Sequence, residues 1–316
     1  MTEDLQKIAA KLKQKNRILI ITHQNPDGDT LGSGMGLYYA LRKLGKRANV
    51  ICSDPFPKKF SYLFQEFEED EFEPDCIVTV DIASPQLLGT YLEHFQDQID
   101  ICIDHHRSNT MEADAVYIDS KAAATCEIIY QLVLELGAEI SPLMANCLYT
   151  GISTDTGCFK FSNTTAETHR IAAELFERGC AYEQINRGLF DTKSKSRIVV
   201  EKEVLETMEF YCEHRVAMIV ITQEMIRNSQ IDTADLDGVA AIPRQIEGVE
   251  VGVTMRERLE GGYKVSLRTC QFVDAAAVCA KLGGGGHIRA AGCVVDGPLE
   301  QAKKALLDVI VPCFEQ

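Results

Sequence analysis

The sequence has no apolar run that approaches the roughly 20 residues of a membrane-spanning helix. Residues 1–17 form an amphipathic pattern and lack the apolar stretch of a signal peptide. Neither a low-complexity segment nor an internal repeat is visible. We therefore expect an ordinary globular protein without a membrane partner, located in the cytoplasm.

The sequence also has no Cys-x-x-Cys pair, although it contains 12 cysteines. These cysteines are scattered and mostly lie inside apolar segments, as Cys76, Cys102 and Cys126 do. A cytoplasmic chain keeps such thiols reduced. We interpret them as small apolar side chains without disulfides.

Basic residues are outnumbered: 32 Lys and Arg face 47 Asp and Glu, which gives a net charge of −15. This balance argues against non-specific wrapping of long nucleic acid, including long duplexes. It does not exclude a short phosphorylated substrate, because carboxylates that hold metal ions have their charge cancelled in the site.

The chain is long enough for about two domains, since 316 residues exceed the roughly 150 typical of one domain. Its first part alternates between short apolar runs, typical of buried parallel strands, and helical patterns. This alternation predicts an α/β domain with a parallel sheet and helices on both faces, over residues 1–185. The expected strands are residues 18–21, 48–51, 76–80 and 100–103, and the expected helices are 5–12, 37–44, 120–136, 142–155 and 165–178.

The segment 186–212 is polar and helix-prone, and we expect it to be a helical linker. Beyond it the pattern predicts a smaller α/β domain over residues 213–316. Its expected strands are residues 216–221, 249–256 and 263–268, and its expected helices are 235–242, 274–282 and 299–309.

Potential metal ligands follow three of the apolar runs in the first domain. His23, Asp27 and Asp29 come after the first run, Asp81 after the third, and Asp104, His105 and His106 after the fourth, with Asp155 later in the chain. The carboxyl ends of adjacent parallel strands converge in one crevice. Taken singly, each has an ordinary explanation: a surface turn around Gly28, helix caps at Asp81 and Asp155, and buried histidines. Their joint occurrence at equivalent strand ends favours a shared site.

The number of ligands favours two metal ions, because one catalytic metal normally takes three or four ligands from protein. The set is rich in oxygen, contains imidazoles and has no thiolate, which suits Mn²⁺ and leaves Mg²⁺ or another divalent ion as alternatives. A pair of such ions supports hydrolysis at phosphorus. We therefore expect a phosphoesterase.

The same residues, in the pattern His-x3-Asp-x-Asp, Asp, Asp-His-His and Asp, resemble the motifs of the DHH phosphoesterase superfamily, which includes RecJ and family II pyrophosphatases. Residues 283–287, Gly-Gly-Gly-Gly-His, look like the motif of the DHHA1 substrate-binding domain. The resemblance covers nearly the whole chain and is strongest to the NrnA type, the nano-RNases that also dephosphorylate 3'-phosphoadenosine 5'-phosphate. It implies an active site in the cleft between a DHH and a DHHA1 domain.

The resemblance also implies a role for each residue. His23, Asp27 and Asp81 would hold one metal ion. Asp29, Asp81, His105 and Asp155 would hold the other, with Asp81 as the bridge. His106 would contact the scissile phosphate, and Asp104 would orient the histidines.

The substrate would be held by Gly284, Gly285, Gly286 and His287, because a glycine run exposes backbone N–H groups to a phosphate or base. A glycine run is also common in flexible turns. Arg268 and Arg289 are further candidates for phosphate contacts, and Arg107 for the phosphate near the metals, although each also fits a solvated surface arginine.

We expect short oligoribonucleotides and phosphorylated nucleotides as substrates, with a homodimer possible. A cyclic-dinucleotide or pApA phosphodiesterase is the alternative within the superfamily. A family II pyrophosphatase is less favoured, because its second domain would not be expected to carry the glycine run. A catalytically dead nucleotide-binding regulator is the alternative from another class, and the complete set of ligands argues against it.

Overall fold

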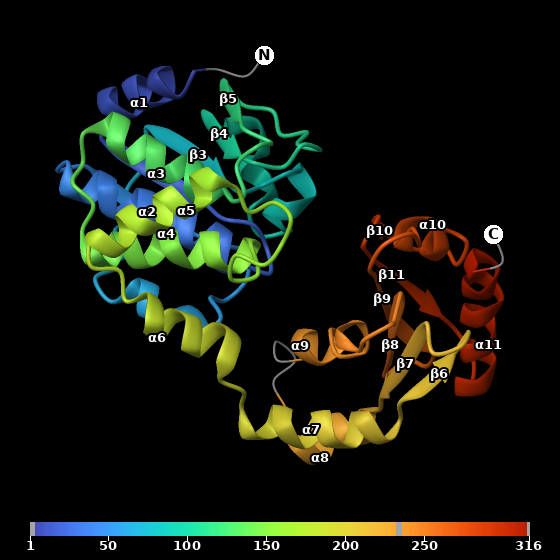
Figure 1. Ribbon diagram of the computed structural model, residues 1–316. Helices are drawn as coiled ribbons and strands as arrows, with labels where there is room; N and C mark the ends of the chain where they lie inside the picture. The colour runs from blue at the N-terminus through green and yellow to red at the C-terminus, as the bar shows by residue number, and fades with distance from the viewer. Residues whose placement is uncertain (1–3, 232–235, 315–316) are drawn as a thin grey trace. The chain divides into compact units, whose positions relative to one another are not determined.

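The structure is a computed structural model that describes residues 4–231 and 236–314. Its contacts divide the chain into two compact units, Met1–Thr192 and Lys193–Gln316 (Figure 1). No helix within the described residues is long and apolar enough to cross a membrane. The active-site cleft expected between two domains stays a prediction.

A five-stranded parallel sheet forms the centre of the first unit. The strand order is β2-β1-β3-β4-β5, so the chain first adds a strand on one side of β1 and then continues on the other side. The reversal lies between β1 and β3, and open parallel sheets bind their ligands at such a point, beyond the carboxyl ends of the strands. The strands are β1 (Arg17–Ile21), β2 (Arg47–Ile51), β3 (Cys76–Val80), β4 (Ile101–Asp104) and β5 (Ala115–Ile118).

The two faces of this sheet are covered differently. Alternate side chains of β1 point to opposite faces: Ile18 and Ile20 join the large core under the α-helices, whereas Leu19 and Ile21 join a smaller core. Short 3-10 helices, η2 (Pro85–Leu88) and η3 (Glu93–Gln98), contribute to that smaller core. The other helical segments of the unit are α1 (Leu5–Gln14), α2 (Gly28–Lys43), η1 (Lys58–Phe64), α3 (Thr125–Leu136), α4 (Pro142–Asp155), α5 (Ala166–Glu177), α6 (Tyr182–Asn186) and the π-turn η4 (Arg187–Asp191).

Helix α2 begins at Gly28, so the expected start at residue 37 was wrong. Its glycines lower helix propensity but allow a close approach to α4. A Cβ at Gly28 would lie 2.4 Å from Thr154 Oγ1, and one at Gly32 would lie 2.4 Å from the Cys147 carbonyl oxygen. This contact brings the end of α4, and with it Asp155, next to the start of α2.

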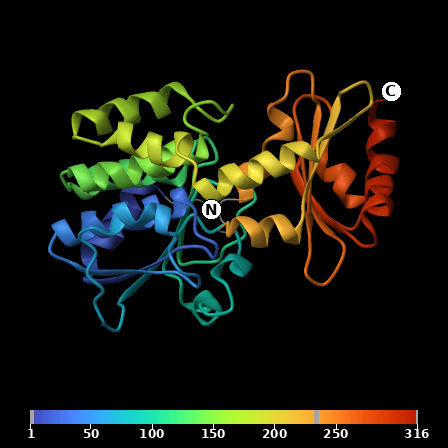
Figure 2. The ribbon, with the colours of Figure 1, turned by 90° about the horizontal axis from the view of Figure 1, so that it is seen from below.

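The second unit contains a mixed six-stranded sheet, in the order β10-β11-β9-β8-β7-β6, of which only β7 and β8 are parallel to each other. Figure 2 shows α11 on one face of this sheet and α7 and α8 on the other. The strands are β6 (Glu209–Tyr211), β7 (Val216–Ile221), β8 (Val251–Glu257), β9 (Tyr263–Thr269), β10 (Gly285–His287) and β11 (Ala290–Val295). The helices are α7 (Lys195–Glu206), α8 (Gln223–Ser229), α9 (Leu236–Ala240), η6 (Pro243–Gln245), α10 (Ala275–Ala280), α11 (Leu299–Ile310) and η7 (Val311–Phe314).

The expected linker, residues 186–212, spans the division between the units. The π-turn η4 belongs to the first unit, whereas α7 belongs to the second and contributes Val200 and Val204 to its core. Part of the helix expected at 235–242 lies outside the described residues. The domain boundaries of the sequence analysis stay a prediction.

Candidate metal centre

His23 and Asp27 lie in the loop between β1 and α2. The Nδ1 atom of His23 is 2.7 Å from the carbonyl oxygen of Gln24, so this nitrogen donates and Nε2 faces the carboxylates. Nε2 lies 3.6 Å from both Asp27 Oδ1 and Asp81 Oδ2. Burial lowers the pKa of His23, but these two carboxylates outweigh it and raise the pKa to about 11. Asp27 caps α2, because its Oδ1 accepts two backbone N–H groups of the first turn.

Asp29 and Asp81 are buried and are held by the first turn of α3. Asp29 Oδ2 accepts a hydrogen bond from the Thr125 N–H at 2.6 Å, and its Oδ1 accepts one from the Cys126 N–H at 2.9 Å. The Thr125 hydroxyl donates to Asp81 Oδ1 at 2.9 Å. One residue of α3 therefore positions two carboxylates from different parts of the chain. Thr125 was missed in the sequence analysis.

His105 contributes a buried nitrogen without a partner. Its Nδ1 lies 3.3 Å from the Ala122 carbonyl oxygen, and its Nε2 makes no hydrogen bond to any described residue. This Nε2 faces three carboxylates, at 3.3 Å from Asp155 Oδ2, 3.8 Å from Asp81 Oδ1 and 3.9 Å from Asp29 Oδ2. A buried polar atom usually has a hydrogen-bond partner, so the free lone pair of His105 Nε2 is well suited to a metal ion.

Asp104 holds His106 at the edge of the site. Its Oδ1 accepts a hydrogen bond from His106 Nδ1 at 2.8 Å, and this bond raises the pKa of His106 to about 9. Asn109, also missed in the sequence analysis, donates to the other oxygen of Asp104 at 2.6 Å. The His106 side chain is 43% exposed and is accessible to a ligand. Arg107 is exposed, and its side chain has no hydrogen bond or ion pair within the described residues.

Three carboxylates repel one another in this centre. Burial and the charges of Asp29 and Asp81 raise the pKa of Asp155 to about 10. Burial is also the main cause of the raised pKa values of Asp29 and Asp81. A buried cation would offset this repulsion and allow all three groups to ionise.

The ligand atoms form groups of the size that a metal ion needs. Asp81 directs Oδ2 toward His23 and Oδ1 toward His105, so its two oxygens face different groups. We call His23, Asp27, Asp29, Asp81, His105 and Asp155 the Asp/His cluster. Donor atoms lie within 4.8 Å of one another in three sets: His23, Asp27 and Asp81; Asp29, His105 and Asp155; Asp81, His105 and His106. With its orphaned nitrogen and mutually repelling carboxylates, the cluster fits divalent cations.

The predicted substrate-binding residues lie in the second unit, where residues 285–292 form an antiparallel hairpin that we call the glycine hairpin. His287, Ala290 and Arg268 are opposed on β10, β11 and β9, so their side chains share one face of the sheet. The neighbouring Leu267 points to the other face, into the core. The next row on the same face contains only small residues, which are Gly285, Gly292 and Ser266. This face of the sheet therefore carries Arg268 and His287 beside small residues.

Arg289 has a structural contact that the sequence analysis did not foresee. Its guanidinium donates hydrogen bonds to the carbonyl oxygens of Val273, at 3.1 Å, and Gln271. The side chain thus connects the turn of the glycine hairpin to the segment that precedes α10.

Two family models match the chain: the DHH family, N-terminal domain, over residues 17–152, and the DHHA1 domain over residues 216–316. The chain is also 35% identical, over 98% of its length and 94% of the relative's, to a bifunctional oligoribonuclease and PAP phosphatase NrnA of Thermus thermophilus. The chain belongs to the DHH family, with a DHHA1 domain. The expected superfamily is confirmed.

Further relatives agree with this membership. A probable bifunctional oligoribonuclease and PAP phosphatase NrnA of Streptococcus mutans is 28% identical, over 90% of this chain and 91% of the relative. A solved structure of an exopolyphosphatase-related protein from Bacteroides fragilis superposes with a TM-score of 0.90 at 26% identity, covering 99% of this DHH protein and 97% of the other. The cyclic-di-AMP phosphodiesterase PdeA of Listeria monocytogenes is 23% identical over 95% of this chain, which spans only 48% of PdeA.

Proposed function

We propose that this DHH-family protein hydrolyses short oligoribonucleotides to mononucleotides, and 3'-phosphoadenosine 5'-phosphate to AMP, with two Mn²⁺ ions. The observation that carries the proposal is the convergence of the Asp/His cluster at the β1/β3 reversal of the sheet. The similarity to NrnA proteins along nearly the whole chain supports the choice of substrates.

In this proposal His23, Asp27 and Asp81 hold one ion, and Asp29, Asp81, His105 and Asp155 hold the other. When bound, the ions would make a bound water nucleophilic at neutral pH and stabilise charge on the attacked phosphate. Asp104 accepts the Nδ1 proton of His106, which leaves Nε2 of this half-exposed ring available to a ligand. A protonated His106 would donate a hydrogen bond to a phosphate oxygen, as Arg107 would from the same loop.

The basic face of the glycine hairpin is proposed to hold the rest of the substrate. Arg268 would bind a phosphate and His287 would stack on a base or bind a second phosphate. Gly284, Gly285 and Gly286 leave this face free of bulky side chains. The role of Arg289 in the proposal is to hold the hairpin turn, because its guanidinium is already bonded to two carbonyl oxygens.

A substrate panel tests the proposal. Purified protein in Mn²⁺ is given di- and trinucleotide RNA, 3'-phosphoadenosine 5'-phosphate, pApA and pyrophosphate, and kcat/KM is measured for each. We expect RNA and 3'-phosphoadenosine 5'-phosphate to be the best substrates. Faster hydrolysis of pyrophosphate would contradict the proposal, and the absence of any turnover would favour a nucleotide-binding regulator.

A pApA or cyclic-dinucleotide phosphodiesterase is the second candidate, because PdeA aligns with 95% of this chain. PdeA is about twice as long, so the shared part is only half of it. The ratio of kcat/KM for pApA to that for a trinucleotide RNA separates the two candidates. A ratio above about ten, one decade in specificity, would favour the second.

A further inference from the structure

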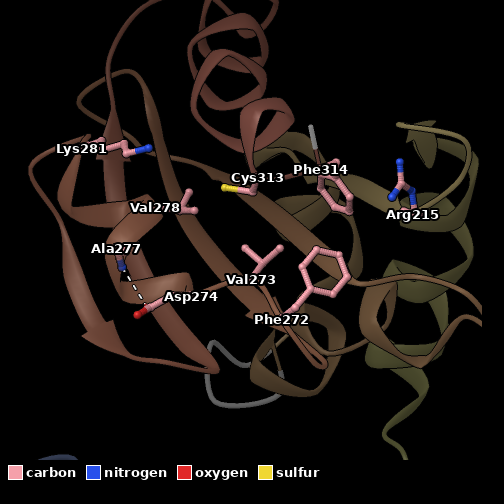
Figure 3. Close-up of a pocket in the computed structure, with 9 residues that line it drawn as sticks. All are labelled: Arg215, Phe272, Val273, Asp274, Ala277, Val278, Lys281, Cys313 and Phe314. Carbon is pink, nitrogen blue, oxygen red and sulfur yellow. Dashed lines mark hydrogen bonds between the residues drawn. The ribbon is translucent and has the colours of Figure 1, made fainter. Parts of the chain in front are cut away.

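The second unit contains a pocket of about 570 Å³ (Figure 3). It lies on the face of the sheet opposite to that of His287 and Arg268. Val273 and Val278 line it and belong to the core on the Leu267 side of the sheet. The pocket lies between α10 and η7, and it is lined by Arg215, Phe272, Val273, Asp274, Ala277, Val278, Lys281, Cys313 and Phe314. Pockets of 300 to 1,000 Å³, roughly, are the size that binds small ligands and cofactors.

Two aromatic rings and two cations give this pocket its chemistry. The rings of Phe272 and Phe314 meet edge to face with centroids 5.6 Å apart, yet Phe272 remains 59% exposed. The guanidinium of Arg215 lies 4.7 Å from the Phe314 centroid, and Lys281 extends from α10 at the opposite end (Figure 3). The carboxylate that lines the pocket, that of Asp274, already accepts the Ala277 N–H at 3.0 Å.

The segment that carries Phe272 is held in place from both sides. The buried carboxylate of Glu250 accepts the backbone N–H groups of Gln271, Phe272 and Val273 at 2.8 to 3.0 Å. Arg289 binds carbonyl oxygens of the same segment. An exposed aromatic ring on a fixed backbone loses little conformational entropy when it binds a flat ligand.

We infer that this pocket binds a nucleoside monophosphate, with the base stacked on Phe272 beside Arg215 and the phosphate bound by Lys281 at the other end. Base stacking on an exposed aromatic side chain and a cation at the phosphate are the two contacts that such a ligand requires. Arg215 has two other partners: its Nε donates a hydrogen bond to the Cys212 carbonyl oxygen at 3.2 Å, and the exposed Glu213 carboxylate lies at 3.8 Å. The pocket shares no residue with the Asp/His cluster or the glycine hairpin, and it needs no metal ion.

The lack of tryptophan in the sequence makes a direct test possible. In Phe272→Trp, the new indole is the single source of tryptophan fluorescence, and AMP should quench it saturably in the presence of EDTA. The control is Tyr91→Trp, which places the indole at a 78% exposed aromatic position in the first unit. Quenching that does not saturate, or that is equal in the control, would overturn the inference.

Calorimetric titration of AMP into metal-free, full-length variants tests the cations and the ring. Lys281→Ala, Arg215→Gln and Phe272→Ala should each weaken binding about tenfold. Lys304→Ala, another exposed lysine of the second unit, should bind as the parent does. Unchanged thermal midpoints exclude misfolding, and Phe272→Tyr, which keeps the ring, should restore binding.

Three partial ligands separate the contributions of the base and the phosphate. Adenosine and ribose 5-phosphate should each bind more weakly than AMP, and inorganic phosphate should compete only weakly. If inorganic phosphate competes as well as AMP, the aromatic ring is not used and the inference is wrong. AMP binding that is lost in His287→Ala but kept in Phe272→Ala would place the ligand on the glycine hairpin instead.

Discussion

The Asp/His cluster of the first unit and the glycine hairpin of the second unit differ in how firmly their side chains are held. Asp29 and Asp81 are at most 3% exposed, and hydrogen bonds from α3 fix both. In the hairpin, Gly285, Gly286 and His287 are all exposed, and β10 is an edge strand that pairs only with β11.

This difference indicates a division of labour. A buried group that bears charge cannot be repositioned by solvent, so its loss should act on the chemical step. An exposed edge strand can adjust to ligands of different length, so removal of a side chain there should mainly weaken substrate binding. Comparing the effects on kcat and on KM of variants in the two regions tests this contrast.

The largest effect is expected at Asp81, whose oxygens face two groups of ligands. Asp81→Asn keeps the size of the side chain but removes the charge, so kcat should fall about a thousandfold or more on every substrate. Steady-state kinetics and the metal content of the purified protein measure the effect. Glu112→Gln, an exposed carboxylate outside the cluster, is the control. Unchanged turnover in Asp81→Asn would remove the basis for the enzyme proposal.

The second effect concerns pH. In the metal-free protein Asp155 has a pKa of about 10 instead of 3.8, so an incoming cation must displace its proton. The affinity for Mn²⁺ should therefore rise about tenfold per pH unit between pH 6 and 8 for each proton released. Calorimetry in buffers of different ionisation enthalpy counts these protons. A pH-independent affinity would contradict the expected protonation.

The raised pKa of Asp155 also determines how the stability of the metal-free protein depends on pH. Between about pH 4 and 10 the Asp155 carboxyl keeps its proton in the folded metal-free protein and has lost it in the unfolded chain, because folding raises its pKa. This contribution is fully present below about pH 4 and is lost as the pH rises toward 10. The thermal midpoint without metal should thus fall with increasing pH, and Mn²⁺ should stabilise more at pH 8 than at pH 6.

A smaller loss is expected at Thr125, whose hydroxyl holds Asp81. Thr125→Val keeps the shape and the backbone N–H that binds Asp29, so only one hydrogen bond is lost. Groups that orient metal ligands contribute about 10- to 100-fold to affinity or activity. Thr125→Ser keeps the hydroxyl and should restore Mn²⁺ affinity as well as kcat. Equal losses of Mn²⁺ affinity and kcat in Thr125→Val and Thr125→Ser would show that packing of this side chain, and not its hydrogen bond, is important.

The candidate site could be predicted from the sequence where its residues directly follow apolar strands. Five residues of the Asp/His cluster lie together because β1, β3 and β4 are short apolar runs whose ends meet, and the sixth, Asp155, is brought to them by the end of α4. Thr125 could not be found in this way, because it contacts Asp29 across 96 positions of the chain through packing of α3. The start of α2 was missed for a related reason: its glycines are poor helix formers locally, and their contacts with α4 compensate.

Strand β5 and the glycine hairpin were not predicted as strands, because their residues are too exposed to form the apolar run of a buried strand. The four residues of β5 are only partly buried after Ala115, so they lack the apolar run of a central strand. The glycine run has neither alternation nor branched residues, and it pairs as β10 because β11 supplies the partner backbone. Edges of sheets are determined by neighbours, which a single sequence does not reveal.

The smallest effect is expected in the glycine hairpin, at His287. Its side chain is exposed and makes no hydrogen bond within the described residues, so His287→Ala should leave the thermal midpoint unchanged. Loss of one stacking or hydrogen-bonding contact to the substrate should raise KM about tenfold for nucleotides, with kcat nearly the same. Lys304→Ala, also exposed in the second unit, serves as the control. If kcat falls in His287→Ala as far as in Asp81→Asn, then the hairpin takes part in the chemical step and the contrast between the two regions fails.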